Sequence, residues 1–258
     1  MLTVTSTQNK TYKLIKSLKQ KKAREENNLF CVEGIKGSLD AVSHGAKPHI
    51  IAVKESIFKR LESSLSPFLD VCFLVSDEIF DPLCDTKTPE GIICVFKIEK
   101  NPLSEISGGL LVYLDSVSDP GNIGTIIRTL DAAGGSAVLL SPGCADLYNP
   151  KTVRASMGSF FSVKTYTHVS YDDLNSLKNK GYNIICGALS DEAFDFKNAT
   201  YNKNTVIVIG NEANGITEAC LSLSDQTVII PILGKAESLN ASVAASLLMY
   251  EWQRNNGK

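Results

Sequence analysis

The stretch "DPGNIGTIIRTLDAAG", residues 119 to 134, joins a glycine-containing turn to an apolar helix that carries a single arginine. We interpret Asn122 as the cap of this helix, with Gly121 and Gly124 leaving its first turn open to a ligand. The apolar residues recur at helical spacing, and Arg128 falls on the opposite, polar side. The stretch therefore predicts a ligand-facing helix start, although an ordinary cap followed by an ordinary surface arginine has the same pattern.

The surrounding sequence alternates short β-rich runs with helical stretches, which predicts an α/β fold with mostly parallel strands. The expected strands are residues 29–34, 49–54, 70–76, 91–97, 110–115, 137–140, 182–189, 205–212 and 227–233, and helices are expected at 35–45 and 55–65. The later strands are nearly continuous apolar runs, as in sheets that are covered on both faces. Ligands of such sheets bind beyond the carboxyl ends of the strands, so we expect the chemistry in the loops that follow them.

Two domains are predicted. The chain of 258 residues, 43% of them hydrophobic and 21% charged, is long enough for two cores. The segment "IEKNPLSEISGG", residues 98–109, interrupts the strand and helix pattern with a proline, serines and a Gly-Gly pair. We therefore expect a first domain at residues 1–100, a linker at 101–109 and a second domain at 110–258.

The charge pattern gives a local rather than a global argument for a nucleic acid partner. The formal net charge is −2, so a polyanion would have to be bound by a basic patch. The first 24 residues hold no acidic residue, and their cations include Lys10, Lys13, Lys21, Lys22 and Arg24. This pattern is typical of a solvated helix face and of an RNA-contacting arm alike.

Metal, disulfide and membrane functions find no support in the sequence. The seven cysteines are scattered and mostly flanked by apolar residues, as expected of reduced thiols in a cytoplasmic protein. No cysteine or histidine spacing matches a metal site, so we expect no metal. No apolar run approaches the roughly 20 residues of a membrane span, and we expect a cytoplasmic protein without a membrane partner.

Two further loops follow late strands. In "VIVIGNEANGI", residues 206–216, Gly210 ends a strand and Glu212 precedes a tight turn. The Glu212 carboxylate could serve only to cap the next helix. The absence of G-K-[ST] after this loop excludes a nucleotide-phosphate loop. The third loop belongs to "IIPILGKAESLNASVAASLLMYEWQR", residues 229–254, in which a strand, a proline and a glycine precede "ESLNAS" and a long helix.

That last helix has apolar residues on two nearly opposite sides. One stripe consists of Val243, Leu247 and Tyr250, and the other of Ala241, Ala245, Met249 and Trp252. A helix that is apolar on two sides is buried on two sides. One side can pack on its own sheet, and the second predicts a homodimer unless the helix is enclosed within one large core.

Taken together, N-x-G-x-x-x-R, G-N-E-x-x-G and P-x-x-G-x-x-E-S-L-N-x-S-x-A resemble the three motifs of the SpoU (TrmH-type) RNA ribose 2′-O-methyltransferases, members of the SPOUT superfamily. The resemblance extends over residues 110–254 and includes "YNPKTVRASMGSFF". It is weaker in the first hundred residues, where "NLFCVEGIKGSLDAV" and "TPEGIICVF" resemble the small substrate-binding domain of many members, which is related to the ribosomal protein L30e fold.

The resemblance implies a parallel-sheet SPOUT domain with a deep trefoil knot, a homodimer, and S-adenosylmethionine as cofactor. Knots are otherwise nearly absent from proteins, and periodicity alone does not predict one. By motif position, the resemblance assigns the cofactor pocket to Gly210, Ile230, Leu239 and Ala241, with Gly187 and Leu189 closing it.

The resemblance also implies a set of catalytic residues. It assigns Arg128 as the catalytic group, with Asn122, Glu212, Ser238 and Asn240 shaping the site. A guanidinium with a pKa above about 12 is a poor free base, so we interpret Arg128 as a group that positions an RNA phosphate and stabilises developing alkoxide charge. Its outward direction suits a role in the partner subunit's site.

RNA binding is expected from the basic N-terminal residues and from Lys151 and Arg154, because phosphate contacts supply most sequence-independent affinity. The implied reaction is methyl transfer to a ribose 2′-hydroxyl, with ribosomal RNA favoured over transfer RNA by analogy with two-domain members. A non-catalytic RNA-binding protein on the same fold remains an alternative. A Rossmann-type dehydrogenase is disfavoured because no G-x-G-x-x-G follows a strand.

Overall fold

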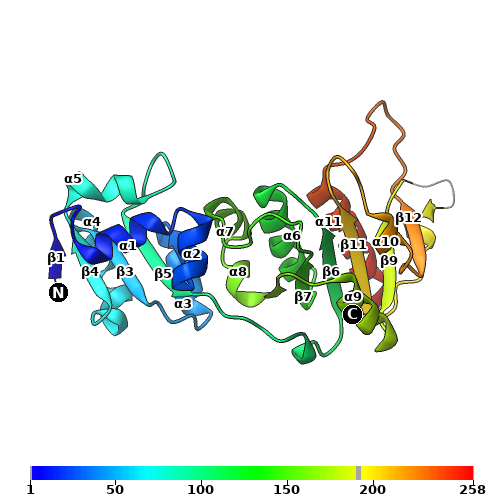
Figure 1. The fold of residues 1–258 in the computed structure, drawn as a ribbon, viewed down its shortest axis with the longest axis horizontal. Helices are drawn as coiled ribbons and strands as arrows, with labels where there is room; N and C mark the ends of the chain where they lie inside the picture. The colour runs from blue at the N-terminus through cyan, green and yellow to red at the C-terminus, as the bar shows by residue number, and fades with distance from the viewer. Residues whose placement is uncertain (1, 190–192, 258) are drawn as a thin grey trace. The chain divides into compact units, whose positions relative to one another are not determined.

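The structure is a computed structural model that describes residues 2–189 and 193–257. It contains two compact units (Figure 1). The first consists of Met1–Glu99 together with Tyr148–Phe161, and the second of Lys100–Leu147 together with Ser162–Lys258. The first unit is therefore discontinuous in sequence, a feature that the predicted boundary at residues 101–109 did not include. The assignment of residues 1–100 and 110–258 as functional domains stays a prediction.

The first unit is built on a five-stranded mixed sheet in the order β1-β4-β3-β5-β2. Its strands are β1 (Leu2–Val4), β2 (Leu29–Glu33), β3 (Ile50–Lys54), β4 (Cys72–Val75) and β5 (Ile92–Lys97). Strand β5 is antiparallel to both of its neighbours, unlike the mostly parallel sheet expected from the sequence. The alternation of apolar runs does not carry strand direction, which is why the sequence could not reveal this.

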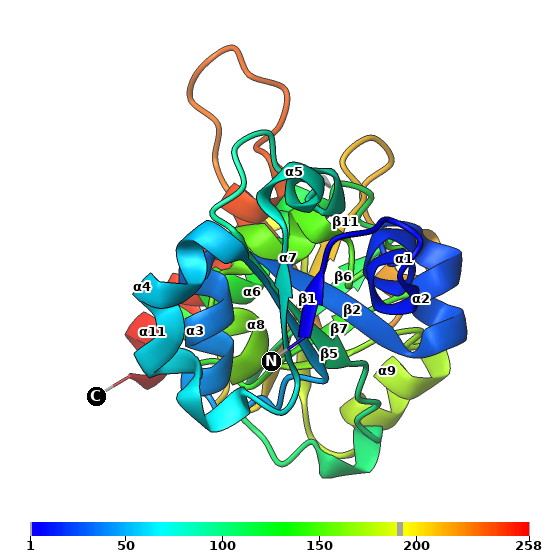
Figure 2. The same ribbon diagram turned by 90° about the vertical axis from the view of Figure 1, so that its left-hand side faces the viewer.

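Helices cover both faces of this sheet, as Figure 2 shows. The helices are α1 (Lys10–Ser17), α2 (Lys21–Asn27), α3 (Ile35–Ser43), α4 (Glu55–Leu65) and α5 (Asp77–Phe80), together with α7 (Pro150–Ser156) and α8 (Ser159–Ser162). Helix α1 buries Tyr12 and Ile15 against one face, while α3 and α4 lie on the other. Asn9 caps α1 with its side-chain oxygen, which fixes where the basic segment begins its helix.

The late segment Tyr148–Phe161 packs within the first unit. The rings of Tyr148 and Phe160 lie 5.0 and 5.3 Å from the ring of Phe30 on β2, and Phe161 lies 5.1 Å from Phe96 on β5. Offset and edge contacts at these distances are favourable for aromatic pairs. The first unit therefore takes part of its core from residues that the resemblance had grouped with the methyltransferase motifs.

The second unit is a seven-stranded, entirely parallel sheet in the order β10-β12-β9-β11-β6-β7-β8. Its strands are β6 (Leu110–Asp115), β7 (Ala137–Leu140), β8 (Lys164–Tyr166), β9 (Asn183–Gly187), β10 (Phe194–Asp195), β11 (Thr205–Gly210) and β12 (Gln226–Ile229). Strands β6 and β11 are neighbours at the centre of the sheet, in register from Leu110 opposite Thr205 to Asp115 opposite Gly210. The loops that leave these two strands therefore start side by side.

Helices cover both faces of this sheet (Figure 1). They are α6 (Pro120–Ala132), α9 (Tyr171–Asn179), α10 (Glu218–Leu221) and α11 (Ala241–Asn256). Residues of α9 and α10 belong to one core with Tyr113 and Val208 on the central strands. Helices α6 and α11 contact one another, and α11 crosses back over β11, β6 and β9 after the chain leaves β12. This crossing brings the start of α11 to the start of α6.

Candidate active site

Three loops of the second unit meet at the carboxyl ends of its strands. We define the first loop as residues 116–122, the second as 211–217 and the third as 230–240; they follow β6, β11 and β12. One chain of side-chain hydrogen bonds joins all three. Asn240 Nδ2 donates to Asn122 Oδ1 over 3.0 Å, and Asn122 Nδ2 donates to Glu212 Oε1 over 2.8 Å. The three predicted motifs are thus brought together in space.

Glu212 is the acceptor on which this cluster converges. Its Oε2 accepts from the backbone N–H and the hydroxyl of Ser118 at 3.1 and 2.9 Å. Its Oε1 accepts from the Asp119 N–H at 3.2 Å as well as from Asn122. Partial burial raises the pKa of Glu212, but the hydrogen bonds from Asn122 and Ser118 outweigh it and lower this pKa to about 2. The carboxylate is therefore ionised at neutral pH and acts as an acceptor.

Asn122 has a role different from the helix cap that the sequence predicted. The cap of α6 is Asp119, whose side chain accepts the Asn122 backbone N–H at 3.0 Å. Asn122 lies within the first turn and is 8% exposed. Its carboxamide instead bonds two side chains: the nitrogen donates to Glu212 and the oxygen accepts from Asn240. The cap prediction for Asn122 was wrong because the preceding Pro120 begins the helix and leaves the capping position to Asp119.

Asn240 caps α11, and Ser238 lies just before it. The Asn240 Oδ1 accepts the backbone N–H groups of Ser242 and Val243 at 2.9 and 3.4 Å, while its amide nitrogen reaches Asn122. One side chain thus starts the last helix and ties it to the first loop. Ser238 is outside this hydrogen-bonded cluster and lines the neighbouring pocket.

Arg128 lies on the same helix as Asn122 but is not brought into the cluster. It is exposed on α6, on the polar side that the helical wheel predicted. Within residues 2–189 and 193–257 it has no hydrogen-bond or ion-pair partner. The site of a single chain therefore contains Asn122, Glu212 and Asn240 together, and leaves the guanidinium of Arg128 directed outward.

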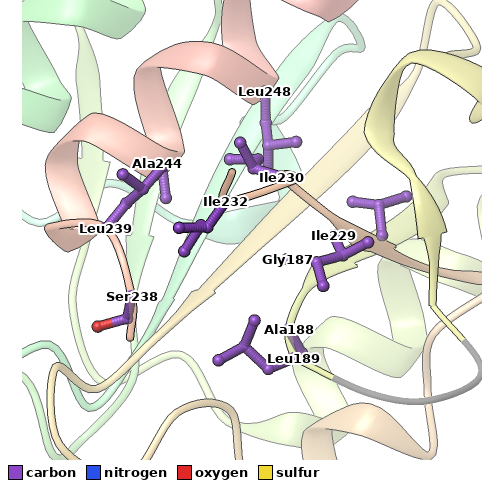
Figure 3. Close-up of a pocket in the computed structure, with 11 residues that line it drawn as sticks. Gly187, Ala188, Leu189, Ile229, Ile230, Ile232, Ser238, Leu239, Ala244 and Leu248 are labelled. Carbon is purple, nitrogen blue, oxygen red and sulfur yellow. The ribbon is translucent and has the colours of Figure 1, made fainter. Parts of the chain in front are cut away.

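An apolar pocket of about 120 Å³ adjoins the third loop (Figure 3). Four predicted cofactor residues line it: Gly187, Leu189, Ile230 and Leu239. They come from the end of β9, the segment after β12 and the loop before α11, and they surround one space. Further lining residues that the sequence reasoning missed are Ala188, Val228, Ile229, Ile232, Ala244 and Leu248.

The pocket places Ala244 and Leu248 on a third side of α11, one turn apart. The sequence shows the four-residue spacing of Ala244 and Leu248. These two residues lie between the two apolar stripes on the helical wheel, so the sequence alone did not mark them as a separate face. Gly187 faces Leu248 across the pocket wall, since a Cβ there would lie 2.9 Å from Leu248 Cδ1. Ala244 and Leu248 are therefore the residues by which α11 shapes this pocket.

Two predicted cofactor residues have another place in the structure. Gly210 does not line the pocket; a Cβ on it would come within 2.4 Å of backbone atoms of Gly215 and Ile216, so its own loop requires glycine. Ala241 is the first residue of α11 and is buried at 6% exposure, also outside the pocket wall. Both residues shape the loops and do not face the pocket within the described structure.

The two apolar stripes of α11 differ in burial within one chain. Ala241, Ala245, Met249 and Trp252 are buried. Val243, Leu247 and Tyr250 are 47%, 40% and 50% exposed. An exposed apolar stripe at helical spacing is a common sign of a contact surface. It lies on the helix that packs against α6, the helix of Arg128.

The predicted RNA-binding residues all lie in the first unit. Lys10, Lys13, Lys21 and Lys22 are exposed on α1 and α2, and Lys151 is exposed on α7. The two lysines of α2 are within 3.8 Å of glutamates one turn later, which reduces the net charge of that helix.

Arg24 and Arg154 are engaged by the protein itself. Arg24 is 3% exposed, and its Nη1 donates to the Leu18 and Lys19 carbonyls at 2.7 and 2.9 Å. The prediction that Arg24 contacts RNA is wrong for this reason: its guanidinium holds the turn between α1 and α2. Arg154 pairs with Asp85 over 2.8 Å and keeps one third of its side chain exposed.

The described residues form neither a metal site nor a membrane-spanning helix. Across the described ranges, no group of three or more histidine, cysteine or acidic side chains is placed to hold a metal ion. No helix in this part of the chain is both long and apolar enough to cross a membrane.

Comparison with known proteins identifies the family. Residues 109–250 match the model of the SpoU rRNA Methylase family, and residues 9–94 match the MRM3-like substrate binding domain. The chain is 34% identical over 250 residues to the 23S rRNA (guanosine(2553)-2′-O)-methyltransferase RlmP of Bacillus subtilis, covering 97% of this chain and 98% of that one. It is 40% identical to the tRNA (guanosine(18)-2′-O)-methyltransferase of Escherichia coli K12, over 56% of this chain and 63% of the relative.

Solved structures agree with both units of the fold. The AdoMet-bound rRNA methyltransferase from Sinorhizobium meliloti superposes with a TM-score of 0.89 at 30% identity, covering 99% of this chain and 98% of that one. The parallel-sheet unit is thus a SPOUT methyltransferase fold, preceded by a substrate-binding domain. With its three motifs joined around one cluster, this chain belongs to the SpoU rRNA methyltransferase family.

Proposed function

We propose that this protein transfers the methyl group of S-adenosylmethionine to a ribose 2′-hydroxyl of ribosomal RNA. The observation that carries the proposal is the hydrogen-bonded chain Asn240–Asn122–Glu212 beside an apolar pocket, at the strand ends where this family has its motifs. The 2′-hydroxyl is a weak nucleophile, so the site must align it and ease the loss of its proton.

The pocket has the chemistry that the cofactor needs. S-adenosylmethionine, when bound, supplies an electrophilic methyl group on a sulfonium. The aliphatic lining and the absence of a Cβ at Gly187 suit the flat adenine ring, which packs against small and branched side chains without demanding charge. Ile230, Leu239, Ala244 and Leu248 would contact it. Ser238, at the rim, offers a hydroxyl to a polar group of the cofactor or substrate.

Arg128 supplies the positive charge of the proposed site. We propose that it binds an RNA phosphate and stabilises the alkoxide that develops on the 2′-oxygen. It does so in the neighbouring subunit, because in one chain it points away from the Asn122 cluster. Support comes from its exposure and its lack of a partner in the described part of the chain.

The partner that completes this site is a second copy of the chain. Val243, Leu247 and Tyr250 form an exposed apolar stripe on α11, and α11 lies against the helix that carries Arg128. A self-complementary contact over this stripe would carry each Arg128 toward the other subunit. Homodimerisation thus buries the stripe and completes the proposed site in one step.

We further propose that the third loop and α11 form the trefoil knot of the family. The chain leaves β12 near the sheet edge, yet α11 packs on β11, β6 and β9 near the centre. To get there it must cross the loops that follow the central strands. A crystal structure whose chain trace is topologically unknotted, so that pulling the two ends apart would leave a straight line, would contradict the knot.

Ribosomal RNA is favoured as substrate over transfer RNA. The 23S rRNA relative from Bacillus subtilis aligns with both units of this chain, whereas the tRNA relative from Escherichia coli aligns with 56% of it. The segment that matches the substrate binding domain, residues 9–94, is therefore covered by the alignment with the ribosomal enzyme. The seven unpaired cysteines support a reducing compartment such as the cytoplasm, where ribosomal RNA is found.

One experiment tests the function. Purified protein is mixed with radiolabelled S-adenosylmethionine and with separate pools of unmodified ribosomal and transfer RNA. We expect label in ribosomal RNA, resistant to alkaline cleavage at the modified ribose, and about 100-fold less with Arg128→Ala. Label in transfer RNA alone would favour the tRNA alternative. RNA binding without label in either pool would favour a non-catalytic RNA-binding protein.

A further inference from the structure

A buried carboxylate outside the predicted site fastens two of its loops together. Asp115, the last residue of β6, is 0% exposed. Its Oδ2 accepts the backbone N–H and the hydroxyl of Thr217 at 2.8 and 2.9 Å, and its Oδ1 accepts the Tyr171 hydroxyl at 2.9 Å. Three donors compensate much of the cost of burying a charged group. The contacts reach Thr217 at the end of the second loop and Tyr171 at the start of α9.

The other end of the second loop is fastened to the next residue of the chain. Asn211 Nδ2 donates to the Ser116 carbonyl at 2.8 Å, and Asn211 and Gly215 exchange backbone hydrogen bonds of 2.9 Å. Ser116 itself has a positive φ of 60°, which turns the first loop sharply after β6. The second loop is therefore held at both ends by Asp115 and Ser116, with Glu212 between the two ties.

Glu212 needs these ties. Its side chain is exposed, so water competes with its donors, and each hydrogen bond contributes little by itself. An untied loop would let the carboxylate turn into solvent at small cost. Fixing both ends of the loop reduces the conformational entropy that is lost when Glu212 accepts hydrogen bonds from Ser118 and Asn122, which favours their formation.

We propose that Asp115 is a positioning residue of the active site. Through Thr217 it holds the second loop where Glu212 meets the donors of the first loop, and through Glu212 it holds Asn122. Its effect on rate rests on the proposed methyl transfer, but its effect on the loops does not. Asp115 does not line the apolar pocket, so we expect its removal to leave cofactor affinity unchanged.

Hydrogen–deuterium exchange tests the loop effect in the full chain. Asp115→Ala removes all three hydrogen bonds of the carboxylate. Tyr171→Phe removes the bond to Asp115 Oδ1 and the 2.8 Å contact between the Tyr171 hydroxyl and Thr217 Oγ1, but it keeps both hydrogen bonds from Thr217 to Asp115. We expect exchange in peptides covering residues 116–119 to become about tenfold faster in Asp115→Ala and to stay unchanged in Tyr171→Phe. Unchanged protection in Asp115→Ala, or equal loss in both variants, would overturn the proposal.

A double-mutant cycle tests the effect on rate. Asp115→Ala should lower kcat about 30-fold with Glu212 present and less than about threefold in a Glu212→Ala background, because the effect passes through Glu212. The Kd of S-adenosylmethionine should change less than about twofold in every variant. Equal losses in both backgrounds, or a weakened cofactor Kd, would show a general structural role and overturn the assignment.

Thr217→Val carries the same tests should Asp115→Ala fail to fold. It keeps the backbone N–H of residue 217 and removes the hydroxyl, so we expect the same pattern at about fivefold instead of 30-fold. A wild type that methylates no RNA would contradict the proposed function, and the exchange measurement would then decide on Asp115 by itself.

Discussion

At the scale of single residues, Glu212 combines an exposed position with strong hydrogen bonding. Its pKa is lowered to about 2, below its usual 4.5, because Asn122 and Ser118 donate to the ionised form. A depressed carboxylate pKa stabilises the folded state above the unfolded-state pKa, and this contribution is lost as the pH falls toward the folded-state value. The stabilisation by Glu212 is therefore complete above about pH 5 and disappears between pH 5 and 2.

Glu212→Gln tests this pH dependence. We expect the variant to be less stable by about 1 kcal/mol at pH 7, because water screens part of the interaction at this exposed side chain. The difference in free energy of unfolding between wild type and variant should shrink as the pH falls from 5 to 2. Urea unfolding at several pH values measures it, and a difference that stays constant down to pH 2 would contradict the lowered pKa.

A side chain added at Gly187 would occupy part of the apolar pocket and would not contact the Glu212 cluster. Gly187→Ala places a methyl group 2.9 Å from Leu248 Cδ1, so we expect the Kd of S-adenosylmethionine to rise about tenfold. Isothermal titration measures this change. Gly37→Ala is the matched control, since its methyl group meets Val32 at 3.2 Å in the first unit. Equal affinities for Gly187→Ala and wild type would place the cofactor elsewhere.

At the scale of elements, the sequence predicted the strands better than their contacts. The expected strands at 110–115 and 137–140 are confirmed as β6 and β7, and the helix at 55–65 as α4. Apolar runs and turn residues are local signals, and these elements depend on them. The meeting of Asn240 with Asn122 could come only from the family resemblance, because 118 residues separate them and no local pattern joins them.

Helix α11 carries the element-scale prediction. Leu247→Glu places a charge in the middle of the exposed stripe, so we expect a folded monomer that keeps its wild-type far-UV circular dichroism spectrum and loses methyl transfer by at least about 100-fold. Light scattering gives the mass. Asn179→Glu, on the exposed surface of α9 over the opposite face of the sheet, should remain dimeric and active. A wild-type monomer at working concentration would contradict the shared site.

At the scale of the whole molecule, the two units are not two consecutive pieces of sequence. Residues 148–161 resemble a methyltransferase segment, but Phe160 and Phe161 complete the aromatic core around Phe30. Sequence reasoning groups a segment with the motifs nearest to it in the chain. The residues "GSFF" carry no local signal that indicates which hydrophobic core the two phenylalanine rings enter. Deleting residues 1–99 would uncover these rings, so the second unit is not separable at residue 100.

The first unit also carries the last prediction, which concerns RNA affinity. Lys10→Glu with Lys13→Glu reverses two exposed charges on α1, and we expect RNA binding to weaken about tenfold or more at 100 mM salt. The magnitude of the slope of log affinity against log salt should fall by about 1.4, because each lost phosphate contact removes about 0.7 for single strands. The cofactor Kd should not change. Lys59→Glu with Arg60→Glu is the matched control, since these exposed cations lie on α4 over the opposite face of the same sheet. If both double variants weaken RNA binding equally, the net charge of the first unit decides the affinity. The basic helix α1 would then have no specific role in RNA binding.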